Sequence, residues 1–103
     1  MMRKTLDQLI GQLIIAGFRN GTISGNSTIL KYIDDYNLSG VILYDEDQEK
    51  KVPKTRNIKS LKQLKDLIEK LQKRSETPLF VSIDQEGGNV NRLKKDYGFP
   101  EFP

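Results

Sequence analysis

SLKQLKDLIEKLQKRSETPLFVSID, residues 60–84, decides the fold class, because it reads as a helix followed directly by a strand. Ser60 and Gln63 have the spacing of a capping box, which marks a helix start. Leucine and isoleucine then recur at helical spacing through residue 71, as in an amphipathic helix. Residues 79–84 are the short apolar run of a strand. A helix feeding a strand in this way is half of a βαβ unit.

The preceding part of the chain repeats the same alternation. Two further apolar runs predict strands buried in a parallel sheet, and one segment between them has helical spacing. Thr5 and Gln8 form a second capping box before a short helix. The strands are expected at 13–18 and 40–44, the helices at 6–11 and 29–37, and loops at 19–28 and 45–57.

The order strand, helix, strand, helix, strand predicts an α/β fold with three parallel strands and two right-handed crossover helices. We expect one domain, 1–103, because the length allows no more. A complete (β/α)8 barrel needs about 250 residues. The predicted sheet is therefore incomplete, with unpaired backbone at its outer edges.

Composition limits the chemistry that these residues can perform. The chain has no Cys, His or Trp, which excludes a disulfide framework, a thiolate nucleophile, a histidine metal site and a histidine triad. Acid–base catalysis would fall to Asp, Glu, Lys or Tyr. The 17 basic and 14 acidic side chains are interspersed, which favours a solvated surface over a nucleic-acid patch.

No segment reads as a targeting or membrane signal. Residues 1–4, MMRK, imitate the basic start of a signal peptide, but Asp7, Gln8 and Gln12 interrupt the apolar run that should follow. No stretch approaches the roughly 18 apolar residues of a membrane span. We expect a soluble, cytoplasmic protein without a membrane partner.

The most informative polar residues follow the third strand. Working residues of parallel α/β folds lie at the carboxyl ends of strands. Residues 84–88 read DQEGG, so two carboxylates flank an amide and two glycines allow a tight turn or a close approach to a ligand. Such groups accept hydrogen bonds from sugar hydroxyls, and a nearby arginine could donate them. A polar-ligand site and an ordinary strand-end turn are both open readings of Asp84, Gln85, Glu86, Gly87, Gly88 and Arg92.

Two other readings of these polar residues fare differently. A phosphate cradle is disfavoured, because the two glycines lack GxGxxG spacing and the neighbouring acids would repel phosphate. An acid–base pair of Asp84 and Glu86 requires an irregular turn, which the sequence does not decide.

A calcium loop beginning at Asp45 fails. Asp47 and Glu49 imitate ligand positions, but Lys50 stands where Gly is needed and Arg56 where the bidentate Glu belongs.

At Asp84 the sequence resembles a known family. Residues 79–93, LFVSIDQEGGNVNRL, resemble the DQEGGRVxRL segment of glycoside hydrolase family 3, particularly its bacterial β-N-acetylhexosaminidase-like branch. Residues 10–18 are similar to the family's IGQLxxxGF opening. Residues 40–71 resemble its GVILF, RNI and QL…LI..LQ run, and 97–100 resemble its continuation. The matches run in order along essentially the whole chain.

The resemblance implies a TIM-barrel-like catalytic domain, of which this chain supplies the first third. It implies a hydrolase that retains configuration at β-linked sugars, usually N-acetylglucosamine, by double displacement at an Asp nucleophile, without a cofactor. The family's nucleophile and assisting His lie downstream of this segment. No residue here matches either, so we expect no catalytic residue in the chain and no hydrolysis by the chain alone.

Substrate binding is what the resemblance carries over to individual residues. Asp84 matches the motif Asp that binds hydroxyls of the non-reducing-end sugar, and Arg92 matches the second motif Arg, which helps to hold that sugar. Asn89 departs from the first motif Arg. Gln85 and Glu86, with the two glycines, are expected to support the turn. The implied partner is a β-linked, N-acetylglucosamine-containing saccharide, not a nucleic acid.

A second hypothesis is a self-contained α/β binding or interaction module without catalysis. Such a module would use the exposed edges of its small sheet for self-association.

Overall fold

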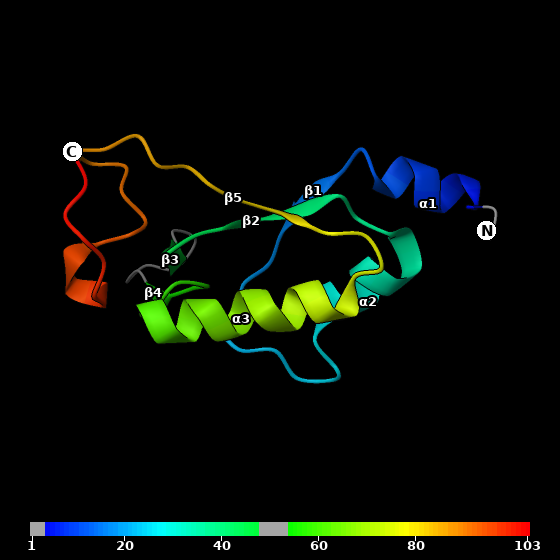
Figure 1. Cartoon of the computed structure of the whole chain (residues 1–103), viewed down its shortest axis with the longest axis horizontal. Helices are drawn as coiled ribbons and strands as arrows, with labels where there is room; N and C mark the ends of the chain where they lie inside the picture. Colours follow the sequence, from blue (N-terminus) through cyan, green and yellow to red (C-terminus); the bar gives the residue numbers. More distant parts are fainter. Residues whose placement is uncertain (1–3, 48–53) are drawn as a thin grey trace.

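The computed structural model describes residues 4–47 and 54–103. Its elements follow the predicted alternation of strands and helices, with additional short elements (Figure 1). In chain order they are α1 (Leu6–Gly11), β1 (Ile15–Gly17), α2 (Thr28–Tyr36), β2 (Gly40–Leu43), β3 (Glu46–Asp47), β4 (Lys54–Thr55), α3 (Leu61–Arg74), β5 (Phe80–Ile83) and the 3-10 turn η1 (Lys95–Tyr97).

A three-stranded parallel sheet in the order β1-β2-β5 forms the centre of the fold. Gly40 of β2 lies opposite Ile15 of β1 and Phe80 of β5, and the register continues along all three strands. The crossover helices α2 and α3 lie together on one face of the sheet (Figure 1). The predicted α/β class and parallel topology are confirmed.

Both predicted capping boxes are present. The side-chain oxygens of Thr5 and Ser60 accept from the backbone amides of Gln8 and Gln63, and the glutamine side chains bond back to the cap amides. These bonds satisfy amides that have no partner inside a helix and so determine where each helix begins.

The hydrophobic core lies between the sheet and its two crossover helices. Alternate residues of β2, Val41 and Leu43, are almost fully buried and face the helices. Leu67 and Leu71 of α3, also fully buried, pack in the same cluster, which confirms the stripe read from the sequence. The other buried members are Ile29, Leu30, Ile33, Leu38, Ile58, Leu79 and Phe99.

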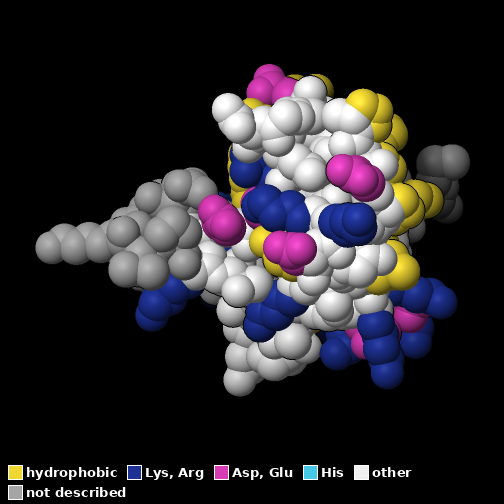
Figure 2. Space-filling view, turned by 90° about the vertical axis from the view of Figure 1, so that its left-hand side faces the viewer, with side chains coloured by type: hydrophobic (Ala, Val, Ile, Leu, Met, Phe, Trp, Pro, Cys, Tyr) yellow, Lys and Arg dark blue, Asp and Glu magenta, His cyan; other side chains and the backbone are white. Residues whose placement is uncertain are grey.

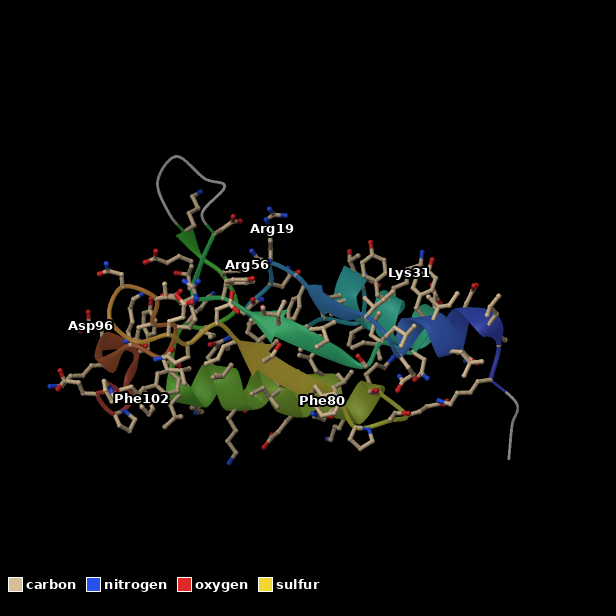
Figure 3. All side chains as sticks on the ribbon, turned by 90° about the horizontal axis from the view of Figure 1, so that it is seen from above. Arg19, Lys31, Arg56, Phe80, Asp96 and Phe102 are labelled. Atoms are coloured by element: carbon tan, nitrogen blue, oxygen red, sulfur yellow. The ribbon has the colours of Figure 1, made fainter. Side chains whose placement is uncertain are left out.

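The prediction that residues 13–18 form a strand buried on both faces is wrong. β1 has three residues, and the apolar run is mostly exposed: Leu13 is 85% exposed and Ile15 is 51% exposed. β1 lies at the sheet edge, and the helices cover only one face. Phe80 of β5 points to the uncovered face and is 72% exposed (Figure 3). An apolar run predicts full burial only where neighbours exist on both sides.

The prediction of a featureless loop over 45–57 is also wrong. Glu46–Asp47 and Lys54–Thr55 pair as a short antiparallel ladder. Backbone bonds from Arg56 to Asp45 (2.9 Å) and from Asn57 to Tyr44 (2.9 Å) continue this ladder toward β2. Two-residue strands are too short to show an alternating pattern, so periodicity could not reveal them. The residues between the two strands, 48–53, lie outside the described part of the chain. They include Glu49 and Lys50 of the rejected calcium loop.

No helix in residues 4–47 and 54–103 is long and apolar enough to cross a membrane.

Candidate functional site

The three parallel strands end together at one end of the molecule, which Figure 2 faces. Basic and acidic side chains lie interspersed on this surface. The residues that follow β1, β2 and β5 meet here, because the carboxyl ends of parallel strands share one edge of the sheet.

Asp84 follows the last residue of β5 and is exposed to solvent. None of the hydrogen bonds among the described residues uses its side chain, so its carboxylate is open to a ligand. The structure therefore places Asp84 at the carboxyl end of β5, and its role in ligand binding stays a prediction.

A tight turn follows Asp84. The amides of Glu86 and Gly87 donate to the carbonyl of Val90 at 2.9 and 3.0 Å. Gly87 and Gly88 have φ of 81° and 55°, in the left-handed region that favours glycine. The two glycines thus let the chain reverse immediately after the strand. Glu86 is exposed at this turn.

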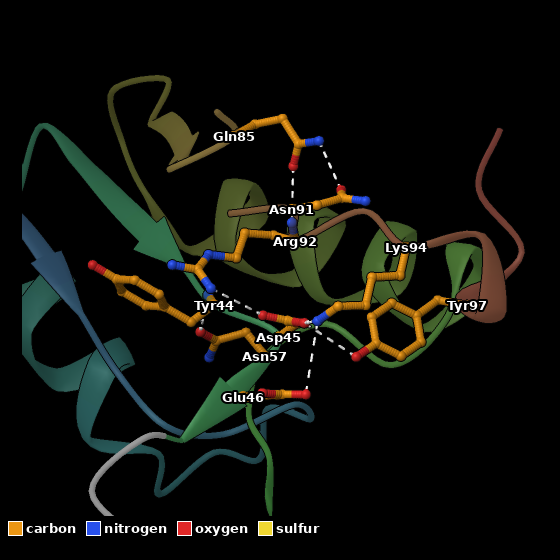
Figure 4. A network of polar contacts seen from close by, with 9 residues as sticks. All are labelled: Tyr44, Asp45, Glu46, Asn57, Gln85, Asn91, Arg92, Lys94 and Tyr97. Atoms are coloured by element: carbon orange, nitrogen blue, oxygen red, sulfur yellow. Dashed lines mark hydrogen bonds and ion pairs between the residues drawn. The ribbon is translucent and has the colours of Figure 1, made fainter. Parts of the chain in front are cut away.

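Gln85 ties the turn to the segment that carries Arg92 (Figure 4). Its Nε2 donates to Asn91 Oδ1 at 2.7 Å, and its Oε1 accepts from the Arg92 amide at 2.8 Å. The Gln85 side chain thus holds the Arg92 backbone near the end of β5.

The Arg92 side chain extends toward the end of β2 and is 19% exposed. Its guanidinium carbon lies 5.2 Å from the centre of the Tyr44 ring, within cation–π range. Its Nη1 lies 3.4 Å from Asp45 Oδ1, and its buried Nε has no hydrogen-bond partner. Arg92 is therefore oriented by a ring and a charge, with hydrogen-bonding capacity unused.

Asp45 is fully buried and collects donors from one later segment of the chain. Besides Arg92, Lys94 Nζ and the Tyr97 hydroxyl donate to Oδ2, the latter at 3.1 Å. Lys94 Nζ also lies 3.7 Å from Glu46. A buried carboxylate is stable only when it is paired and hydrogen-bonded in this way.

Asp45 also contributes to raised pKa values of two of its partners, Lys94 and Tyr97. Burial by itself would lower the pKa of Lys94, but the bond to Asp45 and the charge of Asp45, together with Tyr97 and Glu46, outweigh burial and raise that pKa above its usual value. Burial, followed by the charge of Asp45, raises the pKa of the Tyr97 hydroxyl. Both residues keep their protons well into the alkaline range.

Asn57 joins the ends of β1 and β2 from a fully buried position. Its Oδ1 accepts from the Tyr44 amide at 3.0 Å, and its Nδ2 donates to the carbonyls of Phe18 and Asn20 at 3.0 and 2.9 Å. Arg56 also donates to the Phe18 carbonyl, at 2.8 Å, and lies 4.7 Å from the Tyr44 ring centre. Tyr44 therefore has two guanidinium groups near its ring.

Sequence reasoning did not assign roles to Tyr44, Asp45, Arg56 or Asn57. The position of Tyr44 and Asp45 directly after a strand was a usable signal. Their partners lie 12 to 52 positions away and depend on tertiary packing, which local patterns do not encode. Among the residues that the structure describes, no three acidic side chains lie close enough together to hold a metal ion.

The geometry defines an α/β unit with a three-stranded parallel sheet and polar side chains gathered at the carboxyl ends of its strands. A family model, the glycosyl hydrolase family 3 N-terminal domain, matches residues 5–102. The chain belongs to glycoside hydrolase family 3.

Relatives and a solved structure agree with this family. The chain is 31% identical to Beta-hexosaminidase A of Pseudoalteromonas piscicida over 89% of its own length and 17% of that protein. It is 36% identical to the Beta-hexosaminidase of Glaesserella parasuis over 64% of its own length and 16% of that protein.

The fold matches a glycoside hydrolase family 3 β-N-acetylglucosaminidase from Paenibacillus sp. str. FPU-7. The TM-score is 0.71 at 33% identity, over 89% of this chain and 16% of that chain. The chain thus spans about a sixth of the length of these proteins, and its fold is that of part of a TIM-barrel-like domain.

Proposed function

We propose that this chain forms the glycon-binding part of a retaining glycoside hydrolase that acts on β-linked N-acetylhexosamine sugars. Membership of the family and the names of the relatives support the class of substrate. The DQEGG segment with Arg92, set at the carboxyl end of β5, supports the location of the site.

The observation that carries the proposal is the open Asp84 carboxylate beside a braced turn. Asp84 would accept hydrogen bonds from sugar hydroxyls, and Arg92 would donate to sugar oxygens. Hydrogen bonds to charged groups contribute about 1.5–3 kcal/mol each, so each of the two residues would contribute measurably to the affinity for one sugar ring. Gln85 and the glycine turn would hold Asp84 and Arg92 in a fixed position relative to each other.

Catalysis by the 103 residues alone is not part of this proposal. The chain contains no His and no residue that resembles the family's nucleophile segment. We expect no release of chromophore from a chromogenic β-N-acetylglucosaminide by the purified chain. Hydrolysis of this substrate by an activity that co-purifies with the chain over successive chromatography steps would contradict this expectation.

Binding is tested separately from catalysis. Saturation-transfer NMR with methyl β-N-acetylglucosaminide measures weak affinity for the wild-type chain and for Asp84→Ala. We expect Asp84→Ala to weaken binding at least tenfold, equivalent to about 1.4 kcal/mol. Asp35→Ala, which removes an exposed carboxylate on α2, is the matched control and should leave affinity unchanged. Equal affinity in Asp84→Ala and wild type would remove Asp84 from the site.

Self-association through the sheet edges is the second candidate function. β1 and β5 are the two outer strands of the sheet, and Leu13 beside β1 and Phe80 on the uncovered face of β5 are 85% and 72% exposed. Exposed apolar strand edges favour pairing with another chain. Sedimentation velocity should then show a defined oligomer that Phe80→Lys disrupts, and a monomer at all concentrations would exclude this function.

A further inference from the structure

Asp45 stands out because it is fully buried and yet its Oδ1 lies 3.4 Å from Nη1 of Arg92, a residue of the proposed sugar site. Its three side-chain partners, Arg92, Lys94 and Tyr97, all come from one segment that follows the DQEGG turn (Figure 4). Asp45 therefore fastens this segment to the end of β2, the central strand.

Two anchors act on Arg92 from opposite ends of the residue. At the backbone, Gln85 accepts from the amide at 2.8 Å. At the guanidinium, the carboxylate of Asp45 lies 3.4 Å from Nη1, and the Tyr44 ring lies alongside. Between these anchors the long side chain has few rotamers left, so its donors point in a defined direction.

The contact between Arg92 and Asp45 is long for a hydrogen bond, whereas Lys94 and Tyr97 occupy the other carboxylate oxygen. Arg92 thus uses one Nη1 donor in a long contact, and no other side chain among the described residues accepts a hydrogen bond from its guanidinium. A guanidinium in this state can still donate to neutral sugar oxygens, which a bidentate ion pair would prevent.

We propose that Asp45 is a positioning residue, which holds the Arg92 guanidinium in the orientation needed to donate to a bound sugar. This inference rests on the proposed function, since it assumes that Arg92 contacts the sugar. Asp45 itself is buried behind Arg92 and touches no ligand.

The test compares two carboxylate-to-amide substitutions. Asp45→Asn keeps the shape and removes the charge that attracts Arg92. Glu46→Gln is the matched control, because Glu46 is the next residue in the chain and its carboxylate lies 3.7 Å from Lys94 Nζ. We expect affinity for methyl β-N-acetylglucosaminide to fall about fivefold to tenfold in Asp45→Asn and less than twofold in Glu46→Gln.

A second readout follows Arg92 directly and does not depend on sugar. A guanidinium held in one orientation gives a dispersed, slowly exchanging Nε–H NMR signal. The Arg92 signal, assigned by its loss in Arg92→Ala, should be present in wild type and Glu46→Gln and should shift or broaden in Asp45→Asn. A purely structural role would alter backbone signals throughout the sheet in Asp45→Asn without singling out Arg92.

Lys94→Met provides a variant that keeps the carboxylate buried with one cation fewer. Among the described residues, Arg92 is then the one cation paired with Asp45. The Arg92 signal should therefore persist, and affinity for the sugar should stay within twofold of wild type. If Asp45→Asn does not fold, this variant still decides, because loss of the Arg92 signal in Lys94→Met would overturn the positioning role.

The outcomes separate this inference from the proposed function. If Arg92→Ala weakens sugar binding and Asp45→Asn changes neither affinity nor the Arg92 signal, the positioning role is wrong and the proposed site stands. If Arg92→Ala leaves affinity unchanged, Arg92 is not a sugar contact, and the proposed function fails at that residue.

Discussion

Replacing Asn57 with Ala should destabilise the chain strongly, because this one side chain joins two strand ends from a fully buried position. The substitution removes three hydrogen bonds, one accepted from Tyr44 and two donated to Phe18 and Asn20. The three partner groups differ in whether another hydrogen-bond partner is available to them after the substitution.

The expected cost follows from the fate of each partner. The Phe18 carbonyl keeps the bond from Arg56, and Asn20 is exposed and can bind water. The half-buried Tyr44 amide is left without its acceptor, which costs about 1–3 kcal/mol, and the two lost donations cost about 0.5–1.5 kcal/mol each. The sum is about 2–6 kcal/mol, and the lower half applies because both carbonyls keep another partner, so we predict a loss of about 3 kcal/mol in the free energy of unfolding.

Urea denaturation followed by circular dichroism measures this loss. With a slope of about 1.5 kcal/mol per molar urea, the midpoint should fall by about 2 M. Asn26→Ala is the matched control, since Asn26 is exposed in the loop before α2, and its midpoint should stay close to wild type.

Hydrogen exchange at the Tyr44 amide provides an independent measure if unfolding is not two-state. Exchange of this amide should accelerate about a hundredfold in Asn57→Ala, because about 3 kcal/mol corresponds to two powers of ten. A stability and a Tyr44 exchange rate both equal to those of wild type would refute the assignment of Asn57 as the link between the strands.

Three further predictions concern the core, a close backbone approach and alkaline pH. Leu71→Ala should cost about 2–5 kcal/mol by urea denaturation, because Leu71 is fully buried, whereas the exposed Leu61→Ala on the same helix should cost little. Gly40→Ala should destabilise the sheet, since a Cβ would lie 2.5 Å from the Phe80 carbonyl oxygen, and Gly25→Ala, which meets nothing within 4 Å, should not. The pKa of the Tyr97 hydroxyl is raised in the fold, so its contribution is complete below the unfolded value of 10.0 and is lost as pH rises through the folded value. Thermal melts should therefore show wild type losing more stability than Tyr97→Phe above about pH 10, and parallel losses would contradict this.

Local patterns accounted for most of the fold. The capping boxes at Thr5 and Ser60 and the leucine stripe of α3 are short-range features, and the structure confirms them. The strands were located for the same reason, because apolar runs bounded by polar residues are visible without tertiary information.

What the sequence did not reveal depends on three-dimensional neighbours. The exposure of Ile15 follows from its place on an edge strand with one open face, and an apolar run looks the same in either setting. Asp45 is charged and sits among charged residues, so its sequence context predicts exposure. Its complete burial arises only because residues 92–97 fold back over the end of β2.

The candidate site divides in the same way. Asp84 and Arg92 came from a motif resemblance and from their place after a strand. The support for Arg92 from Tyr44 and Asp45 came from the structure alone, because a contact across 47 positions leaves no local trace.

The central claim is that a sugar binds at the carboxyl end of β5. Titrating the isotope-labelled chain with methyl β-N-acetylglucosaminide and following its backbone amide NMR signals tests this claim most directly. We predict saturable shifts concentrated in residues 84–92 and absent in Asp84→Ala. Shifts confined to other parts of the chain, or none at saturating sugar, would contradict the claim.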